Sequence, residues 1–168
     1  MSPGARAAAI IFSLDGVTFG DSGTASGDFA LNLINYLSAP VDITTTAGTV
    51  VTVPVSYSWG SLGNTPPTTT FDFNTPGYEW GLHLEFTQAL STSSSGTIDL
   101  VPGGGTVGNY TGSYEICLDS QCGSIPSGTI RFVTAGEVLV PEPASLALLG
   151  VGVLATAASR RRRPVQAA

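Results

Sequence analysis

Apolar and polar residues alternate along several short stretches of the chain. The clearest is WGLHLEF at 80–86, where every second residue is apolar, and 28–33, 51–57 and 130–132 repeat the pattern. A period of two is typical of a strand that buries one face. We therefore predict strands at these stretches, with these side chains facing the core: Phe29, Leu31, Leu33, Val51, Val53, Val55, Tyr57, Trp80, Leu82, Leu84, Phe86, Ile130 and Phe132.

Turn-forming residues separate the predicted strands. Clusters such as GDSG, GNTPP, STSSSG and VPGGG combine Gly, Pro, Asn, Asp and Ser, which favour turns. No stretch before residue 140 shows the 3.6-residue period of an amphipathic helix. The pattern predicts an all-β fold, an antiparallel β-sandwich or jelly roll. Pro54 lies on the polar side of its strand, which indicates an edge or bulged strand.

Charge is distributed unevenly along the 168 residues. All six basic residues are arginines, and residues 1–139 contain only Arg6 and Arg131 against eleven acidic residues, a formal charge of −9. A body with this charge repels nucleic acid, so we expect no nucleic-acid partner.

The end of the sequence differs from the rest. Pro141 and Pro143 break regular structure, and they precede sixteen uncharged residues and then Arg160, Arg161, Arg162 and Arg163. The uncharged run predicts a short hydrophobic helix of ~24 Å, which long arginine side chains help to fit a bilayer core of ~30 Å. Under the positive-inside rule the arginines stay cytoplasmic, so the preceding domain lies across the membrane. The predicted membrane segment is Ala144, Ser145, Leu146, Ala147, Leu148, Leu149, Gly150, Val151, Gly152, Val153, Leu154, Ala155, Thr156, Ala157, Ala158 and Ser159.

The order of Val140, Pro141, Glu142 and Pro143, the apolar run and the arginine cluster resembles the PEP-CTERM sorting signal. That signal is found on exported proteins of Gram-negative bacteria, many of which make exopolysaccharide. The resemblance implies processing near the Pro-Glu-Pro motif by an exosortase, a membrane-embedded transpeptidase-like enzyme. It also implies transient anchoring in the inner membrane, then release to the cell surface or outside. A plain tail anchor is the alternative.

The stretch FSLDGVTFGDSGTASGDFALN is also similar to the opening hairpin of β-rich ectodomains of such proteins.

An exported protein needs an N-terminal signal peptide. Arg6 and the alanines of 7–9 are not preceded by the apolar segment of such a peptide. We expect 1–9 to be the remnant of a truncated signal peptide, although export by another route is an alternative. The expected organisation is then an ectodomain at 10–139, a sorting signal at 140–163 and a tail at 164–168.

The two cysteines suit an oxidising envelope. Cys117 and Cys122 flank LDSQ, a stretch suited to a hairpin loop. The apolar residues of 114–118 alternate with Glu115 and Cys117, so Cys117 is expected on the polar face of a strand. We predict a cross-strand disulfide. Free thiols are an alternative, and a metal site is a weaker one because zinc requires four ligands.

Few residues offer catalytic chemistry. His83, the single histidine, shares a predicted strand face with Glu79 and Glu85, but the two glutamates lie ~20 Å apart, beyond the ~5–10 Å of a glycosidase pair. His83 and Glu85 could join a third ligand in a metal-assisted hydrolase, and a solvent-facing polar row is the simpler interpretation. The loop at 20–28 could hold calcium or form a polar turn. We predict no catalytic residue, metal or cofactor.

The expected function is therefore that of a non-enzymatic envelope or matrix protein, structural or adhesive, with an exosortase and exopolysaccharide as partners. A carbohydrate-binding module is the alternative. Its aromatic platform would be drawn from Tyr57, Trp59, Tyr78 and Trp80, and Trp59 is the best candidate for an exposed ring because Trp80 lies on an apolar face.

Overall fold

The computed structural model describes residues 10–31, 37–38, 40–62, 68–91, 94–120 and 122–140. Strands form at each predicted stretch, although over only part of 51–57, and at other segments of the chain. They are β1 (Ile10–Phe19), β2 (Thr24–Leu31), β3 (Leu37–Ser38), β4 (Val41–Thr45), β5 (Val55–Tyr57), β6 (Trp59–Leu62), β7 (Thr68–Asn74), β8 (Trp80–Leu90), β9 (Gly96–Asp99), β10 (Gly104–Thr106), β11 (Asn109–Thr111), β12 (Tyr114–Cys117) and β13 (Ile130–Val140).

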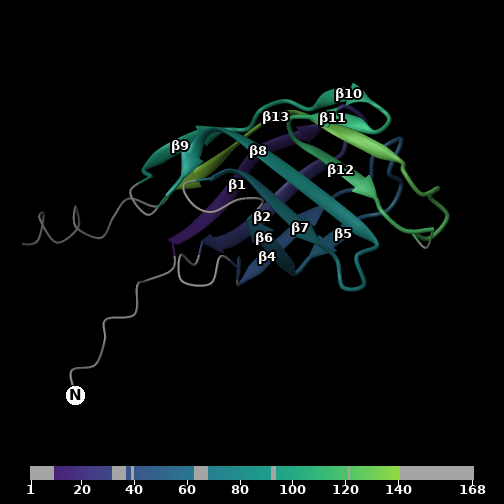
Figure 1. Ribbon diagram of the computed structural model, residues 1–168, viewed down its shortest axis with the longest axis horizontal. Coiled ribbons are helices and arrows are strands. Elements are labelled where there is room, and N and C mark those ends of the chain that lie inside the picture. The colour runs from purple at the N-terminus through teal and green to yellow at the C-terminus, as the bar shows by residue number, and fades with distance from the viewer. Residues whose placement is uncertain are drawn as a thin grey trace, which may run out of the picture.

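These strands form one nearly closed antiparallel sheet, with β10 and β11 as a separate hairpin (Figure 1). The strand order is β3-β6-β7-β8-β12-β13-β1-β2-β4-β5, and β9 pairs with β13 beside this path. The all-β, antiparallel prediction is confirmed.

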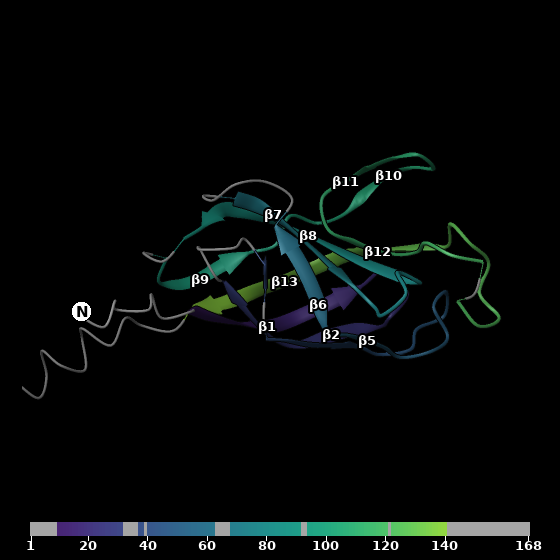
Figure 2. The same cartoon turned by 60° about the horizontal axis from the view of Figure 1, so that its bottom comes forward.

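Strand β13 joins the two halves of the sheet. Its residues 130–132 pair with β12, and later residues pair with β1 and β9. Figure 2 shows β8 and β12 on one side of β13, and β1, β2 and β5 on the other. The long strand thereby lets a single sheet fold over its own core.

Aromatic rings fill the space between the halves. Phe29 of β2 lies 5.0 Å from Phe71 and 5.1 Å from Phe73 of β7, measured between ring centroids. Such packing removes large apolar areas from water, with the tilted ring geometry that aromatic pairs favour. The predicted inward residues of 80–86 are all buried: Trp80, Leu82, Leu84 and Phe86.

The predicted faces of β12 and of the start of β13 are wrong. Glu115, Cys117 and Arg131 are buried, whereas Ile130 and Phe132 are only half-buried. The charged side chains lie inside because Glu115 and Arg131 satisfy each other there. Alternation shows that a strand has two faces, and here the partners across the core decide which face is buried.

The stretch at 51–57 also differs in part. Only Val55–Tyr57 form a strand, and Val53 is exposed although it was predicted to face the core. Pro54 directly precedes β5, which ends the sheet order, so the edge-strand prediction is confirmed. Of the other predicted inward residues, the side chains of Leu31 and Leu33 lie outside the described part.

The final described strand ends at Val140. The predicted hydrophobic helix and the arginine cluster lie outside the described residues, as do 1–9. Within the described ranges, no helix is long and apolar enough to cross a membrane.

Candidate functional site

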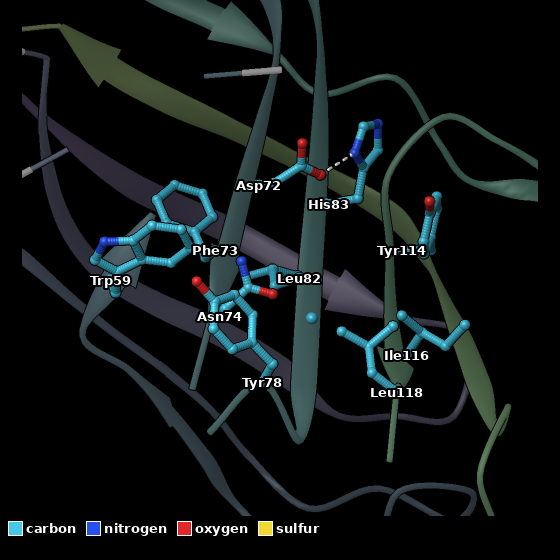
Figure 3. A pocket seen from close by; sticks show the side chains of 11 residues that line it. Trp59, Asp72, Phe73, Asn74, Tyr78, Leu82, His83, Tyr114, Ile116 and Leu118 are labelled. Atoms are coloured by element: carbon cyan, nitrogen blue, oxygen red, sulfur yellow. Dashed lines mark hydrogen bonds and ion pairs between the residues drawn. The ribbon is translucent and has the colours of Figure 1, made fainter. Parts of the chain in front are cut away.

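A groove of about 330 Å³ lies on the outer face of the sheet, over β6, β7, β8 and β12. This face points away from the phenylalanine core. Figure 3 shows aromatic and polar side chains on both sides of β8. The groove is lined by Trp59, Asp72, Phe73, Asn74, Tyr78, Gly81, Leu82, His83, Tyr114, Ile116 and Leu118.

Strand register explains this arrangement. One row across the four strands contains Trp59, Asn74, Gly81 and Ile116, which are successive cross-strand partners. The next row contains Asp72, His83 and Tyr114. Because side chains two positions apart on a strand share a face, both rows line the same outer surface.

The hollow exists at the point where the first row has no side chain. A Cβ atom on Gly81 would lie 3.0 Å from a methyl group of Leu118 and 3.6 Å from Ile116. The glycine therefore forms the floor of the groove, with apolar side chains of β12 and the residue after it along one wall.

Two aromatic rings form the opposite wall. Trp59 is 38% exposed and Tyr78 is 58% exposed, and their ring centroids lie 5.5 Å apart in an edge-to-face arrangement. Trp59 was the predicted exposed ring, and Trp80 is buried in the core as expected. Tyr57 does not belong to this surface, because it is buried in the interior.

Tyr78 has an unusual backbone conformation. Its φ is 60°, a left-handed value that costs a residue with a Cβ about 1–2 kcal/mol. The turn is fixed by the backbone bond from the Tyr78 N–H to the Thr75 carbonyl, at 3.0 Å. The fold therefore holds a bulky exposed ring at a position that glycine or asparagine would occupy with less strain.

The polar end of the groove is built around His83. Its Nδ1 lies 2.6 Å from Oδ1 of Asp72, and its ring stacks on Tyr114 with centroids 5.0 Å apart. Burial, then the charges of Asp72 and Tyr110, raises the pKa of the Tyr114 phenol. Tyr114 therefore remains a neutral hydroxyl over a wider pH range than a free tyrosine.

The structure does not bring the proposed hydrolase residues together into a cluster of ligands. Glu85 accepts a hydrogen bond from the Gly112 N–H at 3.1 Å, and His83 is bonded to Asp72. Within the described ranges, no group of three or more His, Cys, Asp or Glu side chains could hold a metal ion. Asp21, from the suggested calcium loop, points instead toward Arg131 in the interior.

That interior cluster is the main feature that the sequence did not reveal. The Nε of Arg131 donates to Glu115, and its Nη1 lies 3.3 Å from both oxygens of Asp21. Glu115 also accepts hydrogen bonds from Tyr57 at 2.6 Å and Thr45 at 2.7 Å. The cluster therefore links β12 and β13 to β4 and β5 across the core. The pairing of Glu115 with Arg131 across β12 and β13 is seen only in the structure. The signal available in the sequence was that Arg131 is the single basic residue of 10–139 and lies in an alternating stretch.

Opposing influences set the ionisation of this cluster. Burial raises the pKa of Asp21, but hydrogen bonds from the N–H groups of Val51 and Gly23, and the charge of Arg131, outweigh it and lower the pKa overall. Burial, together with the charge of Glu115, raises the pKa of Tyr57 well above its ordinary value. At neutral pH Asp21 is thus ionised and Tyr57 is neutral.

Cys117 and Cys122 are joined by a disulfide whose Cα atoms lie 6.0 Å apart. The bond is not cross-strand, because Cys122 lies in the connection between β12 and β13. Both cysteines are buried, so Cys117 faces the interior and not the predicted polar side.

Residues 139–163 match the family model described as the PEP-CTERM protein-sorting motif. The chain carries a PEP-CTERM sorting motif. This motif implies export, membrane anchoring before processing and recognition by an exosortase-type enzyme. Its first two residues, Leu139 and Val140, still belong to β13, and Val140 is buried opposite Gly96. Pro141 to Pro143 of the motif lie outside the described residues. Comparisons with curated proteins and with solved structures found no match.

Proposed function

We propose that the protein is a non-enzymatic structural or adhesive component of the cell surface or its polysaccharide matrix. The observation that carries the proposal is the PEP-CTERM motif at 139–163, whose first two residues are the last two of β13. In this proposal the chain is anchored in the membrane only transiently. The domain acts after processing, on the surface of a Gram-negative cell or outside it.

The position of the motif supports this order of events. Strand β13 extends to Val140, the last described residue, which pairs with Gly96 of β9. Cleavage near the Pro-Glu-Pro motif would therefore leave every described strand intact. The disulfide between Cys117 and Cys122 is suited to an oxidising compartment outside the cytoplasm.

Carbohydrate binding is the second candidate function. The exposed Trp59 and Tyr78 rings beside the polar Asp72 and Asn74 favour it. These features are typical of sites in which a few polar groups orient a ligand on an apolar surface.

Sorting can be tested by expressing the chain behind a complete signal peptide in hosts with and without an exosortase. We expect a mature C-terminus near Pro141 to Pro143 only in the host with the enzyme, as measured by intact mass and cell fractionation. The matched control replaces Pro141, Glu142 and Pro143 by alanine and keeps the apolar run and the arginines. Full-length protein in the inner membrane of both hosts would mean that the C-terminal segment acts only as a tail anchor and not as a sorting signal.

A further inference from the structure

The geometry points to the outer groove as a binding site for a neutral polysaccharide. In this assignment Trp59 and Tyr78 stack on sugar rings, while Asp72 and Asn74 bond to sugar hydroxyl groups. The inference rests on the proposed function, because a protein delivered to the surface or matrix meets such polymers. It adds that the polymer is uncharged and which contact each residue makes with it.

The two walls of the groove match the two kinds of surface on a sugar. A pyranose ring has an apolar face of C–H groups and an edge of hydroxyl groups. Trp59 and Tyr78 offer exposed rings set edge to face, so one sugar can contact a flat ring while its neighbour meets the other. Aromatic side chains bury much apolar area at little entropic cost, which suits them to this contact.

The backbone of Tyr78 supplies independent support. A left-handed φ of 60° on a non-glycine residue is a local strain, and such strain is concentrated at functional sites. The side chain does not repay this cost by burial, since it is more than half exposed. Contact with a ligand explains why a tyrosine occupies this strained and exposed position.

Polar groups lie within the same groove. The Asp72 side chain is 42% exposed, and its hydrogen bond with His83 fixes its orientation. Asn74 lies between Trp59 and Gly81 in the register of the strands. A carboxylate that only accepts and an amide that both donates and accepts can together bind vicinal hydroxyl groups.

Charge selects a neutral polymer. Residues 10–140 contain one arginine, no lysine and eleven acidic residues, and that arginine, Arg131, is buried. The described surface therefore offers no lysine or arginine to an anionic chain, and its carboxylates repel one. A neutral glycan avoids this repulsion.

Affinity electrophoresis of the full chain in detergent tests the inference. The gels contain hydroxyethyl cellulose, galactomannan or dextran as neutral probes, and alginate as the anionic probe. We expect slower migration with at least one neutral probe and none with alginate. Trp59→Ala and Tyr78→Asn should each weaken binding by about tenfold or more, as expected for central aromatic contacts.

Thermal unfolding separates a binding role from a structural one. Asparagine tolerates the left-handed conformation, so Tyr78→Asn should lose binding while its Tm is unchanged or higher. Gly81→Val should fill the floor of the groove and also reduce binding. Val107→Ala is the matched control: Val107 is 90% exposed between β10 and β11 and is not part of the groove. Its binding should equal that of the unaltered chain.

The inference is overturned if no neutral probe retards the chain, if alginate alone does, or if binding survives both Trp59→Ala and Tyr78→Asn. This failure is distinct from failure of the proposed function. Loss of glycan binding in a protein that an exosortase still processes removes only the groove assignment. Glycan binding by a protein that no exosortase processes retains the groove and removes the surface delivery.

Discussion

Arg131 shows how a single residue organises the interior. Its guanidinium faces two carboxylates, Asp21 and Glu115, and its Cζ lies 4.1 Å from the centre of the Phe19 ring. Burying these charged side chains costs desolvation energy, and the hydrogen bonds among them offset that cost. Among the described residues, the Nη2 of Arg131 is a buried nitrogen without a hydrogen-bond partner. The cluster is therefore satisfied at every position but this one.

Replacing Arg131 by methionine tests this role. Arg131→Met would leave two buried carboxylates without their cation, and breaking a buried pair in this way costs about 3–5 kcal/mol. This loss is a large share of the roughly 5–15 kcal/mol by which domains are stable. Urea unfolding at pH 7 should show the loss as a lower midpoint.

A second substitution provides the control. Adding Glu115→Gln to Arg131→Met removes one of the two stranded charges, so the double variant should be more stable than the single one. A loss below about 1 kcal/mol in Arg131→Met would contradict the expected cost of leaving the two carboxylates buried without a cation.

Strands β1, β13 and β9 place three carboxylates side by side. Glu137 pairs with Asp15 on one side and with Asp99 on the other. Like charges in directly opposite positions destabilise a sheet. The row lies next to the end of β13, the strand that leads into the sorting motif.

Neutralising the central member should stabilise the fold. We expect Glu137→Gln to raise the free energy of unfolding by about 0.2–1 kcal/mol, the size of a cross-strand pair. The gain should shrink at high salt, which screens partly exposed charges. Thermal unfolding at low and high salt measures both effects.

Glu79→Gln is the matched control, because it removes the same charge from an exposed position outside the strands. An equal gain in both variants would assign the effect to net charge, and the row would then have no special role.

At the scale of the element, the alternating pattern located β2, β5, β8, β12 and β13, but not always their buried face. In β8 the four alternate residues are large and apolar, so only one face can be buried. In β12 and at the start of β13 both faces carry residues that can be buried, and the paired charges occupy the interior. Alternation cannot distinguish these faces, because the choice depends on Tyr57, Thr45 and Asp21, which are distant in sequence.

The whole molecule should lose stability at both extremes of pH. The folded pKa of Asp21 lies below its ordinary value of 3.8, so its contribution is present above that pH and is lost as the pH falls through the folded pKa. The folded pKa of Tyr57 lies well above 10.0, so its contribution is present below pH 10 and is lost as the pH rises. Urea midpoints from pH 2 to pH 11 should show both declines.

Single substitutions assign each decline to its group. Asp21→Asn should be less stable at pH 7 but lose less further stability under acid, and Tyr57→Phe should do the same under alkali. An acid decline as steep in Asp21→Asn as in the unaltered chain would contradict the assignment to Asp21.

The sequence by itself determined the all-β, antiparallel character of the fold and the sorting motif. Alternation and turns depend on neighbouring residues, and the ordered features from Pro141 to Arg163 are contiguous, so neither requires knowledge of the fold. The apolar neighbours of Trp80 also made Trp59 the better candidate for an exposed ring, and the structure confirms that Trp59 is exposed.

Only the tertiary structure decided the groove and the interior cluster. Trp59, Asp72, Gly81 and Ile116 lie on four strands, and strand pairing aligns them. Asp21 and Arg131 are 110 positions apart yet in contact. Both arrangements depend on register and on which faces meet across the core, and no local pattern encodes either, because each is set by the packing of the whole sheet.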